Sequence, residues 1–168
     1  ASACELTPDT LSLSEIKNFF AQHNKIVAKP ISDGSSHGLH IITSTSELEK
    51  AIEAIKTSEV PYLAEAFVRG QELTVGVIND EGTNQPLPCS AVKLDPDRHF
   101  DYEGKYLGKG VKEITPAPVR QNVSDLAQEI AVMAHNLLDC FGYSRTDLII
   151  DKDGAVFLET NTLPGLTK

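Results

Sequence analysis

Residues 142–161 read GYSRTDLIIDKDGAVFLETN, and this stretch sets the fold of the C-terminal part of the chain. Two runs that are rich in β-branched and large apolar residues, 143–151 and 155–161, flank a short polar segment that ends in glycine. This pattern predicts two antiparallel strands joined by a three-residue loop, 152–154, with the glycine in the left-handed third position. We therefore expect a β-hairpin.

The predicted register brings four polar side chains onto one face of this hairpin. With a three-residue loop, Asp147 faces Glu159 and Arg145 faces Asn161. These four residues share one face because side chains alternate along a strand. Two facing carboxylates repel each other, and a cation between them would reverse that effect. Carboxylate and amide oxygens suit Mg²⁺ or Mn²⁺, so the hairpin is a candidate metal site. The alternatives are a solvated polar face, or a two-residue turn that puts Asp147 and Glu159 on opposite faces.

Hydrophobic periodicity predicts three helices and five further strands upstream of the hairpin. The capping pattern Ser-x-x-Glu starts two helices, at Ser12 and Ser46, and the third and longest helix covers 122–140. The expected strands, in chain order, are 25–30, 39–42, 61–67, 72–78 and 87–94. The polar segment 95–119 is longer than an ordinary connection, which makes it a candidate lid over a site.

A second candidate site is the glycine- and serine-rich loop 33–38, which lies between two predicted strands. Its backbone amides and hydroxyls could surround a phosphate, and Lys29 at the end of the preceding strand could add a positive charge. An ordinary hairpin is the alternative interpretation of such a loop. Residues 104–110 lack the spacing of a P-loop, but Lys105 within them could close over an anion.

Composition excludes several classes of function. The chain has 168 residues, 40% of them hydrophobic, which is enough for a sizeable core. Its formal net charge of −9, without a cluster of basic residues, argues against a nucleic acid partner. No apolar run approaches the roughly 20 residues that span a bilayer, and no signal peptide is visible, so we expect a cytoplasmic protein with no membrane partner.

Taken in order, these motifs resemble the ATP-grasp fold and, more closely, the D-alanine–D-alanine ligase family. The stretches that carry the resemblance are 29–30 with 34–38, 65–70 with 72–77, 101–106 with 116–118, 142–147, and 159–167. The resemblance implies an α+β fold of two α/β lobes whose antiparallel sheets enclose the nucleotide. The small lobe would cover 1–67, and the large lobe 68–168 would include the lid 95–119 and the metal-site hairpin 143–161.

The resemblance also implies which residues bind ATP, the metal ions and the reacting groups. Those implied for the nucleotide are Lys29, Ser35, Ser36 and Lys105 at the phosphates, Glu65, Ala66, Phe67 and Val68 at the adenine, and Glu72 at the ribose. Those implied for the Mg²⁺ or Mn²⁺ ions are Asp147, Glu159 and Asn161. Those implied for catalysis are Arg145 and the Gly165 N–H at the oxyanion, with Ser35 and Tyr106 meeting across the closed site.

The implied activity is an ATP- and Mg²⁺-dependent ligation of two D-alanines through an acyl phosphate, a step of peptidoglycan precursor synthesis for the cell wall. The expected partners are ATP and D-alanine, with a homodimer formed by the full-length protein. Two alternatives stay open. One is another ATP-grasp carboxylate–amine ligase, such as one that takes D-lactate, and the other is a nucleotide-binding fragment without turnover.

The sequence departs from the family pattern at three points. Ala66 stands where the family usually has a lysine beside the adenine. Nothing matches the family's N-terminal domain, and Lys168 comes just before the Ser-Leu pair that helps to hold the second D-alanine. The single methionine is Met133, so no initiator is present. We therefore expect the chain to be the ATP- and metal-binding portion of a longer ligase.

Overall fold

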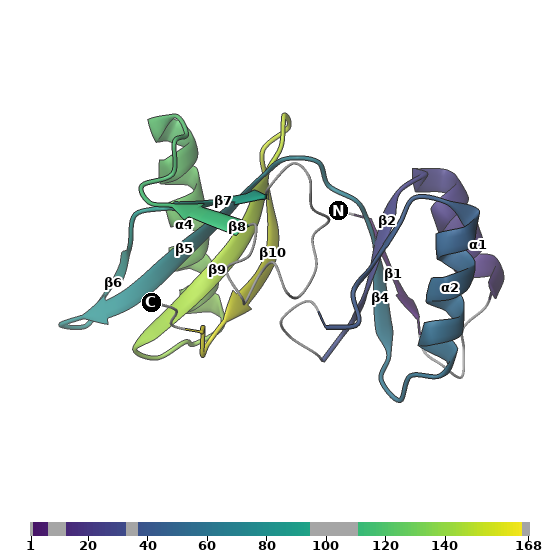
Figure 1. Cartoon of the computed structure of the whole chain (residues 1–168). Coiled ribbons are helices and arrows are strands. Elements are labelled where there is room, and N and C mark those ends of the chain that lie inside the picture. Colours follow the sequence, from purple (N-terminus) through teal and green to yellow (C-terminus); the bar gives the residue numbers. More distant parts are fainter. Residues whose placement is uncertain (1, 7–12, 33–36, 95–110, 166–168) are drawn as a thin grey trace. The chain divides into compact units, whose positions relative to one another are not determined.

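The computed structural model of the chain describes residues 2–6, 13–32, 37–94 and 111–165. Contacts divide the chain between Phe67 and Val68 into two compact units, and each unit has its own sheet and its own hydrophobic core (Figure 1). All the described strand pairs are antiparallel. The predicted mixed α+β class with antiparallel sheets is confirmed.

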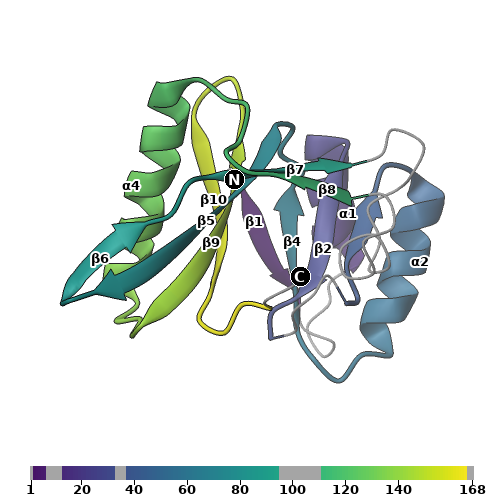
Figure 2. The same cartoon turned by 60° about the vertical axis from the view of Figure 1, so that its left-hand side comes forward.

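The first unit is a four-stranded sheet with two helices on one of its faces (Figure 2). Its elements are β1 (Ala3–Leu6), α1 (Leu13–His23), β2 (Ile26–Pro30), β3 (His40–Ile42), α2 (Thr45–Lys56) and β4 (Tyr62–Ala66), and the strand order is β1-β4-β2-β3.

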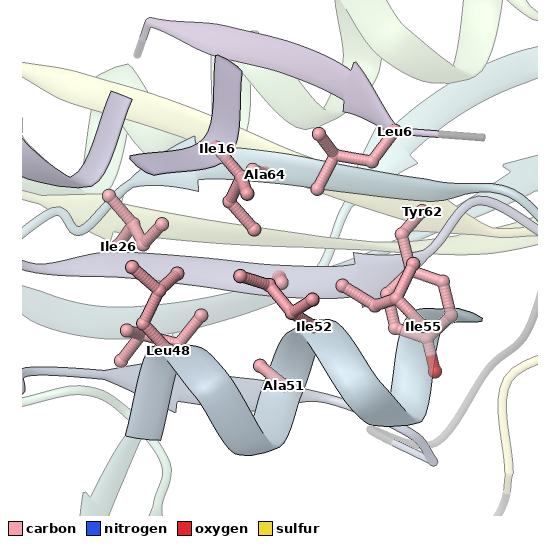
Figure 3. Packing of buried hydrophobic residues seen from close by; sticks show 11 residues of the cluster. Leu6, Ile16, Ile26, Leu48, Ala51, Ile52, Ile55, Tyr62 and Ala64 are labelled. Carbon is pink, nitrogen blue, oxygen red and sulfur yellow. The ribbon is translucent and has the colours of Figure 1, made fainter. Parts of the chain in front are cut away.

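The core of the first unit lies between this sheet and its helices. Alternate residues of β2 and β4 are buried there, among them Ile26 and Ala64, and they pack against the apolar face of α2 (Figure 3). The residues between them, including Lys29 and Glu65, consequently point to the face of the sheet opposite α1 and α2.

Helix α2 begins two residues earlier than the capping pattern at Ser46 predicts. Ser44 is its N-cap, because the Ser44 Oγ accepts the backbone N–H of Glu47 at 3.3 Å. Glu47 reaches back and accepts hydrogen bonds from the hydroxyl and the N–H of Thr43, both at 2.7 Å, and these bonds lower the pKa of the Glu47 carboxyl. The sequence holds two overlapping Ser-x-x-Glu patterns here, and the earlier one forms the cap. Ser12 lies outside the described residues.

The second unit is a six-stranded sheet with one long helix packed on one face. Its elements are β5 (Gln71–Asp80), β6 (Thr83–Pro86), β7 (Ser90–Leu94), β8 (Val111–Ile114), α4 (Gln121–Leu137), β9 (Tyr143–Ile150) and β10 (Ala155–Asn161). The strand order is β10-β9-β5-β7-β8, with β6 paired to β5. Ala127 and Ala131 of α4 pack against Leu73 of β5 and Leu148 of β9, and all four are buried.

Three short strands and one helix end differ from the sequence prediction. The strands β1, β6 and β8 were not predicted, and β8 lies within the segment 95–119 that was expected to be an irregular lid loop. Residues 95–110 of that segment lie outside the described residues. Helix α4 ends at Leu137 instead of residue 140, and Asp139 just beyond it takes a positive φ of 48°. No helix in the described ranges is long and apolar enough to cross a membrane.

Gly70 allows the chain to pass close to β9 just before β5 begins. A methyl group on its Cα would lie 2.2 Å from the backbone oxygen of Ile150 and 2.5 Å from Cγ2 of Ile149. The first of these neighbours is main chain in a paired strand, so it cannot move aside without disturbing the sheet.

We expect Gly70→Ala to lower the free energy of unfolding by about 1–3 kcal/mol through this clash. The matched control is Gly165→Ala, because a methyl group at Gly165 meets nothing within 4 Å. Urea denaturation measures both changes. Equal unfolding midpoints for the two variants would contradict the close approach at Gly70.

Candidate active site

The hairpin of β9 and β10 has a longer turn than predicted. Ala155 pairs with Ile150, so the loop is the four residues 151–154 and the predicted three-residue loop is wrong. The Asp151 carboxylate organises this loop, because its Oδ1 accepts the backbone N–H groups of Asp153 at 2.7 Å and of Gly154 at 2.9 Å. Near the turn, the pairing is therefore shifted by one residue from the predicted register.

A β-bulge restores the predicted pairing before the candidate site. The bulge lies between Phe157 and Glu159, and beyond it Glu159 faces Asp147. With the four-residue loop alone, Leu158 would face Asp147 and the Glu159 side chain would point to the opposite face. The predicted facing of Asp147 with Glu159 and of Arg145 with Asn161 is confirmed, but it depends on a bulge that the sequence analysis did not contain.

The Asp147 carboxylate is the centre of the polar cluster, and this residue is only 4% exposed. Its Oδ1 accepts hydrogen bonds from Thr74 Oγ1 at 2.7 Å and from Arg145 Nε at 2.9 Å. Its Oδ2 accepts from Arg145 Nη2 at 2.9 Å and from Asn161 Nδ2 at 3.3 Å. These four hydrogen bonds fill the acceptor positions that a carboxylate offers, and two of them form a bidentate ion pair with Arg145.

The Asn161 amide lies between the two facing carboxylates. Its Nδ2 donates to Glu159 Oε1 at 3.2 Å as well as to Asp147. The sequence argument placed a cation between these carboxylates, and in this structure the Arg145 guanidinium and the Asn161 amide moderate their repulsion.

The cluster suits a hard divalent cation by the chemistry of its donors. The Asp147 and Glu159 carboxylates both lie within hydrogen-bond distance of the Asn161 amide. Turning that amide would direct its oxygen to the same point as the carboxylates. Among the described residues, no three carboxylate, imidazole or thiol groups come together as a metal site. The candidate ligand set therefore consists of two carboxylates and one amide.

In the first unit, two of the predicted nucleotide residues form an ion pair. Lys29 Nζ lies 2.6 Å from Glu65 Oε2, and the two side chains are about equally exposed, at 28% and 27%. Both residues lie on the face of the sheet opposite α1 and α2. Their strands β2 and β4 are neighbours, so this pair fixes the position of a lysine ammonium on that face.

The predicted adenine segment, residues 65–68, includes the last two residues of β4 and the two residues after it. The Ala66 N–H donates to the Ser2 carbonyl at 2.9 Å, and the Phe67 N–H donates to the Lys25 carbonyl at 3.1 Å. The Lys25 ammonium also lies 3.6 Å from the centroid of the Phe67 ring. The main chain is thus held on both sides up to the boundary between the units.

The remaining predicted site residues divide into two groups. Glu72 of β5 faces Ile149, which puts it on the same face of the second sheet as Thr74 and Asp147, and Gly165 follows the end of β10. The others lie outside the described residues, and they are Ser35, Ser36, Lys105 and Tyr106.

The sequence analysis missed Thr74 as a member of the cluster. Its strand β5 pairs with β9, and Thr74 stands directly opposite Asp147 in that pairing. The alternation along β5 already placed Thr74 on the same face as Glu72, and that was the available signal. The local sequence of β5 does not reveal, in contrast, that β9 is the strand paired with it.

Comparison with known sequences identifies one family. The family model described as the D-ala D-ala ligase C-terminus matches residues 13–168. The D-alanine–D-alanine ligase of Rhodospirillum rubrum is 40% identical over 146 residues, which cover 84% of this chain and 45% of that protein. The ligase of Leptospira interrogans is 37% identical over 143 residues, covering 83% of this chain and 41% of the relative. The chain spans about half the length of the curated relatives it matches.

Solved structures give the same family. D-alanyl-alanine synthetase A from Vibrio cholerae has a TM-score of 0.82 at 25% identity, over 98% of this chain and 50% of that one. The VanG D-Ala:D-Ser ligase from Enterococcus faecalis has a TM-score of 0.78 at 26% identity, over 98% and 48%. The chain belongs to the D-alanine–D-alanine ligase family, of which it represents the C-terminal, ATP-grasp part.

Proposed function

We propose that this chain binds Mg-ATP and forms the nucleotide- and metal-binding part of a ligase that joins two D-alanine molecules. The observation that carries the proposal is the cluster around Asp147, in which the register of two strand pairs gathers two carboxylates, an amide and an arginine. The relatives from Rhodospirillum rubrum and Leptospira interrogans are both named D-alanine–D-alanine ligase, which supports D-alanine as the substrate.

In this proposal Asp147, Glu159 and Asn161 hold one or two Mg²⁺ or Mn²⁺ ions. Such ions, when bound, neutralise the charge that develops on the phosphates during phosphoryl transfer. The ion then takes the place of the Asn161 Nδ2–H or of an Arg145 N–H at the Asp147 carboxylate, because these donors use the same oxygen lone pairs.

In this proposal, residues from each unit contact the nucleotide. Lys29 supplies a positive charge to the phosphates from the face of its sheet opposite α1 and α2, and the Glu65 carboxylate holds its ammonium in place beforehand. The segment 65–68 contacts the adenine through its backbone, and Glu72 binds the ribose hydroxyls. The residues proposed to complete the phosphate site and the closed lid are Ser35, Ser36, Lys105 and Tyr106.

The proposed reaction has two steps. A carboxylate oxygen of the first D-alanine attacks the γ-phosphorus of ATP, the bond to ADP breaks, and an acyl phosphate forms. The amine of the second D-alanine then attacks the carbonyl carbon, phosphate leaves, and the nitrogen loses a proton. Arg145 and the Gly165 N–H stabilise the oxyanion of the tetrahedral intermediate, and donors of this kind are worth roughly 3–4 kcal/mol each. We place this reaction in the cytoplasm, in peptidoglycan precursor synthesis.

A second candidate is a ligase of the same fold with another acceptor. The structural similarity to a D-Ala:D-Ser ligase, at 26% identity, is close to the similarity to D-alanyl-alanine synthetase A, at 25% identity. D-Serine is therefore an alternative acceptor. D-Lactate, and a fragment that binds nucleotide without turnover, are the alternatives that the sequence already left open.

Nucleotide binding is the first test of the proposal. We expect millimolar Mg-ATP to raise the melting temperature of the 168-residue chain, because a ligand at about 100 times its dissociation constant stabilises a protein by about 2.7 kcal/mol. EDTA should remove most of the shift. The absence of any shift with Mg²⁺ or Mn²⁺ would contradict the nucleotide site.

The acceptor is tested by ATP-dependent phosphate release with D-alanine alone, and with D-alanine plus D-serine or D-lactate. D-Alanine alone should give the greatest rate, and mass spectrometry should detect the dipeptide. A greater rate with D-serine or D-lactate would favour the second candidate. Nucleotide binding without release in any mixture would favour a fragment that does not turn over.

Asp147→Asn is expected to lower the free energy of unfolding by about 1–3 kcal/mol, because the Arg145 guanidinium loses its charged partner at a nearly buried position. Glu159→Gln removes an exposed charge facing Asp147, so its unfolding midpoint should stay equal or rise slightly. Both substitutions should weaken Mg²⁺-dependent nucleotide binding. Urea denaturation and calorimetry measure the two effects, and a stabilising Asp147→Asn would rule out the ion pair with Arg145.

A further inference from the structure

We infer that Thr74 is a positioning residue for the metal site, whose hydroxyl orients the Asp147 carboxylate for a divalent cation. The inference rests on the proposed function, and it adds a residue from a strand outside the hairpin. Thr74 Oγ1 donates to Asp147 Oδ1 at 2.7 Å, across the pairing of β5 with β9.

The choice of oxygen is the first reason for this role. Thr74 contacts Oδ1, whereas the Asn161 amide contacts Oδ2 and also reaches Glu159. Oδ2 is therefore the oxygen on the side of the other two candidate ligands. A cation bound at Oδ2 competes with Arg145 and Asn161 for lone pairs, but it leaves the hydrogen bond from Thr74 intact.

The stiffness of the donor is the second reason. Threonine is branched at Cβ and has a restricted χ1 angle, so its hydroxyl occupies a defined position. Thr74 also stands in a ten-residue strand that is paired on both sides, with Asp147 opposite it on β9 and Ser90 opposite it on β7. Arg145, in contrast, is a long side chain that is 30% exposed and can move away when a cation arrives.

The expected size of the effect follows from the behaviour of such hydrogen bonds in metal sites generally. Groups that hydrogen-bond to a ligand, without touching the metal, typically change metal affinity by about 10- to 100-fold when they are removed. Thr74→Val removes the hydroxyl and keeps the branched shape, and Thr74→Ser keeps the hydroxyl.

Thr146 offers a matched control on the same strand as Asp147. Its hydroxyl pairs with that of Thr160 at 2.9 Å, and the residue is fully buried. Thr146 alternates with Asp147 and therefore points to the face that packs against α4. Thr146→Val thus removes a buried hydroxyl from β9 without touching the Asp147 carboxylate.

The experiment measures how much Mg²⁺ the 168-residue chain needs to bind the non-hydrolysable nucleotide AMP-PNP. Mg²⁺ is titrated at a fixed AMP-PNP concentration, the thermal shift is followed, and urea denaturation reports stability separately. For Thr74→Val we expect the half-saturating Mg²⁺ concentration to rise about tenfold. For Thr74→Ser and Thr146→Val we expect it to stay within about twofold of the unsubstituted chain, even though Thr146→Val lowers stability.

The outcomes separate this inference from the proposed function. If the unsubstituted chain binds AMP-PNP with Mg²⁺ but Thr74→Val needs no more Mg²⁺ than it does, the positioning role is wrong and the nucleotide site stands. An equal rise in Thr146→Val, or a failure of Thr74→Ser to restore the Mg²⁺ requirement, also overturns the role. If the unsubstituted chain shows no Mg²⁺-dependent binding, the proposed function fails, and this inference fails with it.

Discussion

The near-complete burial of the Asp147 carboxylate is the constraint on which the second unit depends. An ionised group that is 4% exposed is costly unless charged and hydrogen-bonding partners surround it. Those partners come from three adjacent strands, since Arg145 shares β9 with Asp147, Thr74 lies on β5 and Asn161 on β10. The order β10-β9-β5 is thus required by the charge as well as by the hydrophobic core (Figure 1).

Each unit divides its sheet between packing and chemistry. One face of each sheet is apolar and packs against α1 and α2 in the first unit or α4 in the second. Alternate residues of the central strands form this face. The other face then carries the polar candidates, Lys29 and Glu65 in the first unit and the Asp147 cluster in the second. The period of two along a strand therefore lets one segment stabilise the fold and present functional groups at the same time.

The sequence predicts the part of this arrangement that is local. Apolar runs reveal the central strands, and alternation within the hairpin predicts the facing of Asp147 and Glu159. The short strand β6, which reads Thr-Asn-Gln-Pro, has no apolar pattern and exists because β5 pairs with it. The contact of Thr74 with Asp147 joins residues 73 positions apart, and only the strand order of the sheet determines it.

The β-bulge beside Glu159 ties the length of the hairpin loop to the chemistry of the sheet. Relative to a three-residue loop in a regular ladder, the four-residue loop shifts the pairing by one residue, and the bulge shifts it back by one residue before Asp147. At the present spacing, in which residues 148–158 separate Asp147 from Glu159, the two carboxylates face each other either with a three-residue loop and a regular ladder or with a four-residue loop and one bulge. A homologous hairpin that keeps this spacing must therefore change loop length and bulge together, because either change alone would turn the second carboxylate to the opposite face of the sheet.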